Sequence, residues 1–355
     1  MRSRLIYLLL IMLSGSILPC NGQTDTTAAL YSNQPFIRYY DTLINLKLKV
    51  HTDYETFEQT SGSNYHVDLR PNILLSTKIG VSYRFISFGF GFSPAFLPGN
   101  NETDLKGKTK SWSFGIGTTG RIIQEANIGY VKGFYLKNTG ELVPGWVEGQ
   151  DPYLQVPDLT VIMLNGATGF KFNRNYSISA QHSQTQAQLR SAGSFIPILS
   201  YDYYAIDNKP KTGSDVNSQL SGNLRLIANF GYAYTFVFAR QFYLAAFVQP
   251  GIGLQHTKLI TRMIDGDVKN RYNDPLFRMQ EKIGLGYQGD RFFGGLEGFF
   301  SQSWINENNN AAQLKTNRVY YQFFVGYRFN TPKFVRKSTD AVKGVIPRPI
   351  RNIIE

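Results

Sequence analysis

The sequence predicts an all-β protein, a transmembrane antiparallel up-and-down β-barrel of about twelve strands with long extracellular loops and short periplasmic turns. Apolar residues alternate with polar or small residues along many segments, which is the pattern of strands that bury one face. The connections between these segments are alternately short and long, as in transmembrane barrels. The composition agrees, because 14% of the 355 residues are aromatic and only 17% are charged, against roughly 25% charged in soluble chains.

The composition also excludes two other classes of protein. A mean hydropathy of -0.24 excludes a bundle of membrane helices. A chain with 22 tyrosines and 26 phenylalanines buries enough apolar surface to order itself, which excludes general disorder.

The first residues predict a secretory signal peptide over 1–22. Arg2 and Arg4 precede an apolar run at 5–13 that is followed by small and turn-forming residues, and this order is typical of a cleaved signal. A membrane anchor would need about 20 apolar residues. We expect cleavage between residues 22 and 23, and therefore export.

The chain contains one cysteine, Cys20, so a lipoprotein cleavage site is an alternative reading of the signal. Pro19 argues against it, because a small residue normally precedes a lipoprotein cysteine. If residues 1–22 are removed, the mature chain has no cysteine, which excludes disulfides, thiol catalysis and thiolate metal sites.

Period-two alternation predicts the strands. The clearest segment is 223–238, which has apolar residues at every even position from Leu224 to Phe238. At about 3.3 Å per residue it is long enough to cross a bilayer. The predicted strands are 44–51, 72–83, 87–93, 112–117, 127–137, 159–172, 175–182, 223–238, 242–254, 277–287, 292–304 and 320–329.

The lengths of the connections assign them to the two sides of the membrane. Short ones lie at 83–86, 120–126, 173–175, 239–241 and 288–291, and long polar ones at 94–110, 138–158, 256–274 and 305–317. Segment 189–221 contains the strand-like stretch 195–206, but we interpret it as loop or inward-folded material. That interpretation gives twelve strands, an even number that leaves both termini in the periplasm. An extra hairpin in this segment would give fourteen.

The predicted organisation is a signal peptide at 1–22, a periplasmic N-terminal segment at 23–42, the barrel at 43–329 and a basic tail at 330–355. Prolines at 332, 347 and 349 predict that the tail is an extended periplasmic segment.

Several short strings resemble a known family when they are taken together. They are Arg70-Pro71-Asn72, Pro157-Asp158-Leu159, Arg190-Ser191-Ala192-Gly193-Ser194 and Gly231-Tyr232-Ala233-Tyr234-Thr235. The chain resembles the Bacteroidota family known as domain of unknown function 4421 over nearly all of its mature length. Arg190 stands where this family would be expected to have lysine. The resemblance implies an outer-membrane barrel and supplies no activity.

If the apolar faces of the strands contact lipid, the opposite faces line a basic lumen. Rings of lysine and arginine in a pore favour anions. The alternative is a plugged barrel in which these side chains pair with loop carboxylates such as Asp151 and Asp158. The candidate lumen residues are Lys47, Lys49, Lys78, Arg225, Arg278, Lys282 and Arg328.

The string Arg190, Ser191, Ala192, Gly193 and Ser194 has two readings. A basic residue followed by four small ones permits close backbone packing, so the string is a candidate constriction in the lumen. It is equally well read as a turn outside the membrane.

An enzyme is the runner-up hypothesis, because barrel phospholipases pair histidine with serine. His182 and Ser183 are the best local pair, with His182 expected at the lipid interface. Neighbouring residues of a strand point to opposite faces, however, so we predict no catalytic residues. The histidines have no metal-ligand spacing, so we also predict no metal and no cofactor.

The sequence therefore predicts a non-catalytic outer-membrane barrel of a Gram-negative bacterium. It would be either a small-solute, anion-preferring pore or a structural and assembly partner in an envelope complex; a phospholipase-like enzyme is the alternative. The expected partners are outer-membrane lipid, lipopolysaccharide phosphates and envelope proteins, whereas export argues against nucleic acid.

Overall fold

The computed structural model describes residues 35–52, 54–61, 65–209, 218–263, 266–305 and 312–345. The predicted signal peptide, its cleavage site and Cys20 lie outside these ranges. Within them, no helix has the length and apolarity needed to cross a membrane.

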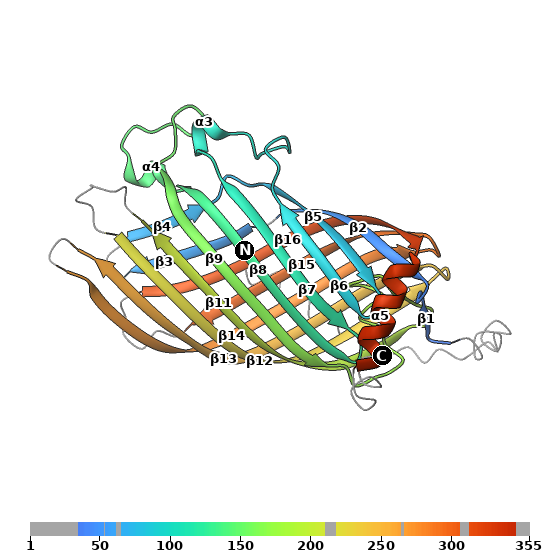
Figure 1. Cartoon of the computed structure of the whole chain (residues 1–355). Helices are drawn as coiled ribbons and strands as arrows, with labels where there is room; N and C mark the ends of the chain where they lie inside the picture. The colour runs from blue at the N-terminus through green and yellow to red at the C-terminus, as the bar shows by residue number, and fades with distance from the viewer. Residues whose placement is uncertain are drawn as a thin grey trace, which may run out of the picture. The chain divides into compact units, whose positions relative to one another are not determined.

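The described strands form one large antiparallel sheet and one small sheet (Figure 1). The strands of the large sheet are β2 (Leu43–Thr52), β3 (Tyr54–Ser61), β4 (Tyr65–Arg70), β5 (Leu75–Tyr83), β6 (Ile86–Phe92), β7 (Lys110–Thr119), β8 (Ile122–Leu136), β9 (Gln155–Phe170), β11 (Ala192–Asn208), β12 (Ser218–Phe238), β13 (Phe242–Arg262), β14 (Val268–Gln288), β15 (Phe292–Ile305) and β16 (Ala312–Asn330).

The large sheet closes on itself. Each strand pairs with its neighbours in the order β16, β15, β14, β13, β12, β11, β9, β8, β7, β6, β5 and β2, and β2 pairs with β16 to complete the circuit. The hairpin of β3 and β4 extends the wall at the long-loop end, where β3 pairs with β16 and β4 with β8. The structure thus confirms the predicted all-β fold class, a closed antiparallel barrel of twelve strands.

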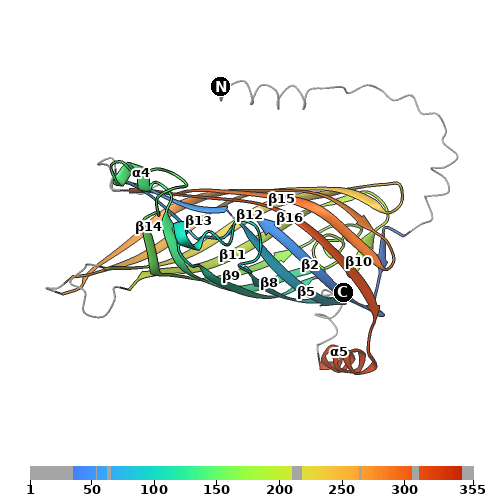
Figure 2. The same ribbon diagram turned by 90° about the horizontal axis from the view of Figure 1, so that it is seen from above.

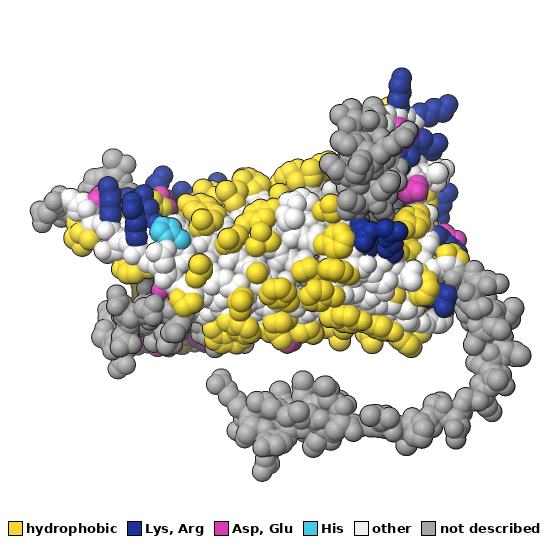
Figure 3. Space-filling model, turned by 90° about the horizontal axis from the view of Figure 1, so that it is seen from below, with side chains coloured by type: hydrophobic (Ala, Val, Ile, Leu, Met, Phe, Trp, Pro, Cys, Tyr) yellow, Lys and Arg dark blue, Asp and Glu magenta, His cyan; other side chains and the backbone are white. Residues whose placement is uncertain are grey.

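The two faces of the wall differ as the alternation predicts. In β12, Leu226 and Phe230 are about half exposed on the outside, whereas Ile227 and Asn229 between them are buried on the inside. The space-filling view shows apolar side chains over much of the outer wall, with lysine and arginine gathered toward its two ends (Figure 3). Such an apolar outer band is the surface that a barrel presents to lipid.

Aromatic pairs mark both edges of the apolar band, as in membrane barrels. Near the end with short turns the pairs are Phe172–Phe195, Phe238–Phe242 and Phe292–Tyr327, and nearer the other end they are Trp112–Tyr130 and Phe277–Trp304.

The short turns lie at one end of the barrel and the long loops at the other. In the three-residue turn 239–241 from β12 to β13, both Ala239 and Arg240 have positive φ, a backbone that tight hairpin turns use. The long loops carry two short helices, α3 (Thr103–Lys106) and α4 (Thr139–Leu142). Figure 1 shows both helices at the end opposite to the short turns.

Two predicted assignments are wrong, and they cancel in the strand count. Segment 175–182 is not a strand, and segment 195–206 belongs to the wall strand β11 rather than to a loop. The physical reason is visible in β11, where Phe195 and Leu199 are exposed and Ile196 and Ser200 are buried. This alternation pairs the strand with β9 and β12 along most of its length.

The described part of the C-terminal tail is also not extended. It forms α5 (Lys333–Val345), because the prolines at 332 and 347 flank this stretch without interrupting it. On the N-terminal side, β1 (Ile37–Tyr39) pairs with β10 (Gln186–Gln188) in the small sheet. This pairing brings the predicted N-terminal segment to the connection between β9 and β11.

Candidate functional site: the barrel interior

The connection from β9 to β11 is the exception among the turns at its end of the barrel. It comprises residues 171–191, which we call the plug, and it folds into the interior instead of turning directly back. The Tyr176 ring of the plug is buried against three inward-facing wall residues, Ile123, Ile196 and Ala233. Plug residues Ser177, Gln184 and Gln188 have no measurable exposure.

Side chains from several wall strands hold the plug. Asn45 of β2 donates to the main-chain oxygen of Ser183 at 2.9 Å, and Lys47 donates to that of His182. On another wall strand, β7, Thr119 shares a hydrogen bond of 2.9 Å with the Ser179 hydroxyl. The bonds from Asn45 and Lys47 satisfy main-chain oxygens of the plug that have no partner in secondary structure, which a buried loop requires.

The tightest anchor is Arg328 of β16, which is fully buried. Its guanidinium donates twice to the Gln184 oxygen, at 3.0 and 2.9 Å, and also to the Gly289 oxygen. The same group lies 4.0 Å from the Tyr40 ring and 4.6 Å from the Phe293 ring. Arg328 thus joins the wall, the plug and the N-terminal segment in one contact.

The small sheet of β1 and β10 completes the closure at the base. The Tyr40 amide donates to Thr185, and the Leu189 amide donates to Phe36. On the wall side, the Gln188 amide donates to the Gln288 side chain at 3.1 Å, and the Gln288 amide group donates back to the Gln188 oxygen.

The seven predicted lumen residues all lie on the inner face, but the structure divides them into three groups. Lys47 and Arg328 hold the plug, as described above. Arg225 and Arg278 lie toward the long-loop end, where they link strands. Lys49, Lys78 and Lys282 lie between these two levels.

The two arginines toward the long loops are bound within the wall. Arg225 donates to Gln255 at 2.6 Å and to the Tyr204 hydroxyl at 2.9 Å. Arg278 forms an ion pair of 3.1 Å with Asp202 and also donates to Ser200 and Asn229. Their role in this structure is cross-strand bonding.

The middle group combines cations and carboxylates. Lys282 pairs with Glu297 at 3.1 Å, and Gln322 donates to the same carboxylate. Within the described ranges, Lys49 and Lys78 form no hydrogen bond or ion pair. Glu125 contacts the His182 imidazole at 3.5 Å. The middle group therefore contains three lysines and two glutamates.

Solvent reaches this middle level. Both His182 and Glu125 face the interior, yet their side chains keep 43% and 31% of their exposure. Burial and the charge of Lys49 hold the pKa of His182 well below its ordinary value. His182 is therefore neutral at pH 7, and its neutral form suits a site surrounded by lysines.

The structure corrects the expectation for His182 and Ser183. His182 points to the interior and not to lipid, and its Nε2 faces Glu125. The Ser183 hydroxyl is buried and bonds to Thr119 and Thr185.

The string from Arg190 to Ser194 marks the return of the chain from the plug to the wall. The Arg190 guanidinium lies 4.2 Å from the Phe36 ring, and the Ser194 hydroxyl accepts the Asn173 amide. A side chain at Gly193 would meet the main-chain oxygen of Ala233 at 2.8 Å, so close strand contact requires glycine there. The string begins β11, whereas the interior is narrowed by the preceding plug residues.

Sequence reasoning missed Glu125 and the plug anchors Asn45 and Gln288. The predicted strand begins at residue 127 and leaves Glu125 in a turn, although the alternation continues back through Ile123. For the plug, the available signal was that the alternation of Tyr176, Ile178 and Ala180 is short and is followed by a largely polar run at 181–188. In the described part of the chain, no group of three or more His, Cys, Asp or Glu is arranged to hold a metal.

Comparisons with known proteins give one family and several distant structures. A family model described as "Domain of unknown function (DUF4421)" matches residues 25–329. No curated protein matches the chain. The outer membrane protease OmpT of Escherichia coli is 10% identical, with a TM-score of 0.38 over 82% of this chain and 98% of that one. The toluene transporter TodX of Pseudomonas putida is 8% identical, with a TM-score of 0.28 over 81% and 90%. The translocator domain of the autotransporter NalP of Neisseria meningitidis is 7% identical, with a TM-score of 0.27 over 81% and 89%.

Proposed function

The chain belongs to the DUF4421 family, and we propose that it is a non-catalytic outer-membrane barrel, closed from inside, that serves as a structural or assembly component of a Gram-negative envelope. The observation that carries this proposal is the plug, which the wall holds with buried hydrogen bonds from several strands. An open pore would need these bonds to break.

The cost of opening favours the closed barrel. A hydrogen bond to a charged group contributes about 1.5–3 kcal/mol, and Arg328 makes two such bonds to Gln184 alone. A population of open barrels would therefore be small.

Placement in the outer membrane is part of the proposal. It is supported by the apolar outer band between two sets of aromatic residues and by the predicted signal peptide. We infer that the basic residues of the long-loop end meet lipopolysaccharide phosphates, as charge complementarity favours. Fractionation of the cell envelope, with heat-dependent gel mobility as the sign of a folded barrel, tests this placement.

An anion-preferring pore is the second candidate, and one observation favours it. Lys49 and Lys78 face solvent inside the barrel without an ion pair in the described residues, so they form a positive surface to which small anions would be drawn. This function requires a state in which the plug leaves the interior. The conductance of the refolded native protein separates the two candidates, since the closed barrel is silent and the pore conducts.

The absence of catalysis is likewise a proposal. It is supported by the separate partners of His182 and Ser183, since the imidazole contacts Glu125 and the hydroxyl bonds to other hydroxyl groups. The native protein is expected to release no fatty acid from phospholipid vesicles. Hydrolysis that disappears in His182→Ala would contradict the proposal and favour a lipid-acting enzyme.

A further inference from the structure

The C-terminal helix α5 lies outside the barrel, beside its wall. Figures 1 and 2 place it near the short-turn end but within the length of the barrel, with its axis across the barrel axis. An ion pair of 2.5 Å between Arg84 and Asp340 joins it to the turn from β5 to β6. Since the barrel axis is the membrane normal in such proteins, α5 lies parallel to the membrane plane.

The helix is amphipathic. Phe334, in its first turn, is 72% exposed. Lys333, Arg336 and Lys337 are exposed. Arg336 points away from Phe334, and Lys333 and Lys337 flank it on one side, at about 100° and about 60° around the helix. A large exposed aromatic ring on a basic amphipathic helix is typical of helices that lie in a membrane interface.

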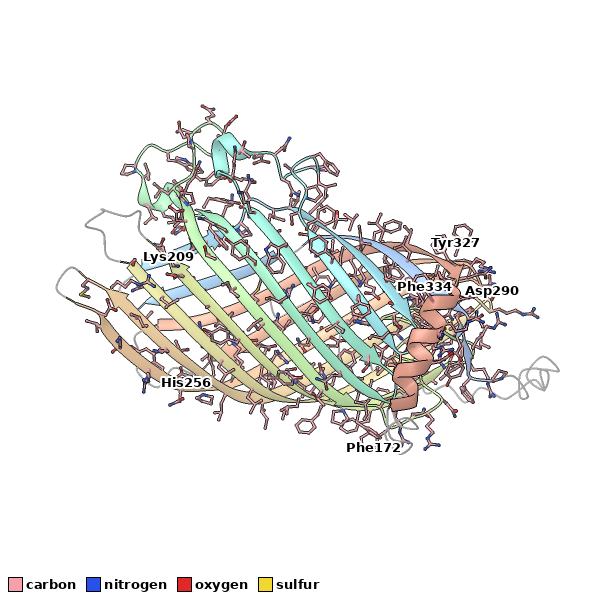
Figure 4. The ribbon with its side chains drawn as sticks, in the orientation of Figure 1. Phe172, Lys209, His256, Asp290, Tyr327 and Phe334 are labelled. Atoms are coloured by element: carbon pink, nitrogen blue, oxygen red, sulfur yellow. The ribbon has the colours of Figure 1, made fainter. Side chains whose placement is uncertain are left out.

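The surroundings of α5 place it at the level of the lipid headgroups. It starts three residues after the end of β16, and Phe329 near that end is exposed. Figure 4 shows Phe334 and Tyr327 at the same end of the barrel as Phe172 and Asp290. Aromatic residues of this kind lie at the boundary between acyl chains and headgroups.

We propose that α5 is a membrane-interface helix that binds acidic phospholipids of the periplasmic leaflet. Phe334 lies among the upper acyl chains, while Lys333, Arg336 and Lys337 meet the phosphate groups. The leaflet follows from the outer-membrane placement proposed above, whereas contact with lipid is a separate statement about the helix. The ion pair with Asp340 fixes the helix against the wall at this depth.

A pair of single-cysteine variants tests the proposal. Removal of residues 1–22 leaves no cysteine, so Phe334→Cys and Arg336→Cys each carry one site for the environment-sensitive dye NBD. Both are reconstituted into vesicles of phosphatidylcholine with phosphatidylglycerol. Heat-dependent gel mobility, scored first, reports whether the barrel has folded and inserted, so a failure of the barrel is seen separately from a failure of the helix.

The dye at 334 is expected to show blue-shifted emission, quenching by nitroxide lipids and protection from iodide, while the dye at 336 stays accessible to iodide. Equal access of iodide to both positions would overturn the proposal, as would a blue shift without nitroxide quenching, which would indicate contact with protein. Omitting phosphatidylglycerol, or changing Lys333, Arg336 and Lys337 to Gln, should reduce protection at 334, on the order of fivefold in membrane affinity per basic residue. Protection that does not depend on the acidic lipid would overturn the preference for acidic phospholipids.

Discussion

Arg328 of β16 donates two hydrogen bonds to the main-chain oxygen of Gln184, which lies 144 residues earlier in the chain. The contact joins the last wall strand to the plug inside the barrel. Because Arg328 also contacts the Tyr40 ring, one side chain closes the base against both the plug and the N-terminal segment.

Arg328→Ala should loosen the plug. The change leaves the Gln184 and Gly289 oxygens without their donor, which costs about 1–3 kcal/mol for each buried group. The midpoint of thermal unfolding, read by gel mobility, should fall, and transient conductance should appear. Arg38→Ala is the matched control, because the Arg38–Asp290 pair is exposed and such pairs contribute about 1 kcal/mol or less. Equal effects of the two variants would contradict a special role for Arg328.

The lipid-facing assignment predicts opposite results for two arginine substitutions on β14. Ile283 is exposed on the outer face between the two sets of aromatic residues, so Ile283→Arg should destabilise the inserted barrel by about 2–4 kcal/mol near the midplane. Gln280 is on the inner face and bonds to Ser301, so Gln280→Arg should cost much less. Unfolding in denaturant with lipid present measures both, and similar losses would refute the assignment of the faces.

The plug should loosen in acid because of His182. Burial and the charge of Lys49 lower its pKa below the ordinary 6.5, so the closed state favours the neutral imidazole. In a released plug the pKa of His182 would return to its ordinary value. As the pH falls, the released state therefore binds a proton before the closed state does. Stability from this group is therefore complete above about pH 6.5 and is lost progressively below it. The groups around the imidazole are Glu125 of β8, Lys47 and Lys49 of β2, Lys78 of β5 and Lys282 of β14.

Thiol labelling measures this opening. With Ala180→Cys, a buried position in the plug, labelling should speed up between about pH 7.5 and about pH 5 relative to the same variant carrying His182→Gln. The comparison at each pH removes the effect of thiol ionisation itself. His256→Gln, on the exposed outer side of β13, is the control and should leave the acid response intact. An unchanged response in His182→Gln would assign the effect to another group.

The lysines of the middle level should set ion preference once the plug is removed. In a variant with residues 173–189 replaced by a short turn, conductance should favour anions, and Lys49→Gln or Lys78→Gln should reduce that preference. Lys258→Gln makes the same change of charge on the exposed outer face and should have little effect. Reversal potentials in a salt gradient measure the preference, and an equal effect of all three variants would contradict the assignment.

Much of the wall could be predicted from sequence because alternation is a local property. Leu226 and Phe230 face out because both stand at even positions of β12. Arg225 stands at an odd position and therefore faces in. The predicted number of twelve strands is correct, although the alternation predicts a strand at 175–182 in place of 195–206. Local alternation did not separate these two segments, because each has apolar residues at alternate positions.

The plug could not be predicted in this way, since its conformation depends on distant partners. The contacts of Gln184 with Arg328 and of Gln188 with Gln288 span 144 and 100 residues. No local pattern encodes them. The inward position of Lys47 follows from alternation, but its bond to the His182 main chain requires knowledge of where the plug lies.

The most direct test of the closed barrel is the conductance of the refolded mature protein in a planar bilayer, compared with the variant lacking plug residues 173–189. The account predicts that the native protein is silent while the variant shows stable, anion-preferring steps. Stable steps of similar size from the native protein would contradict the closed barrel and establish a pore.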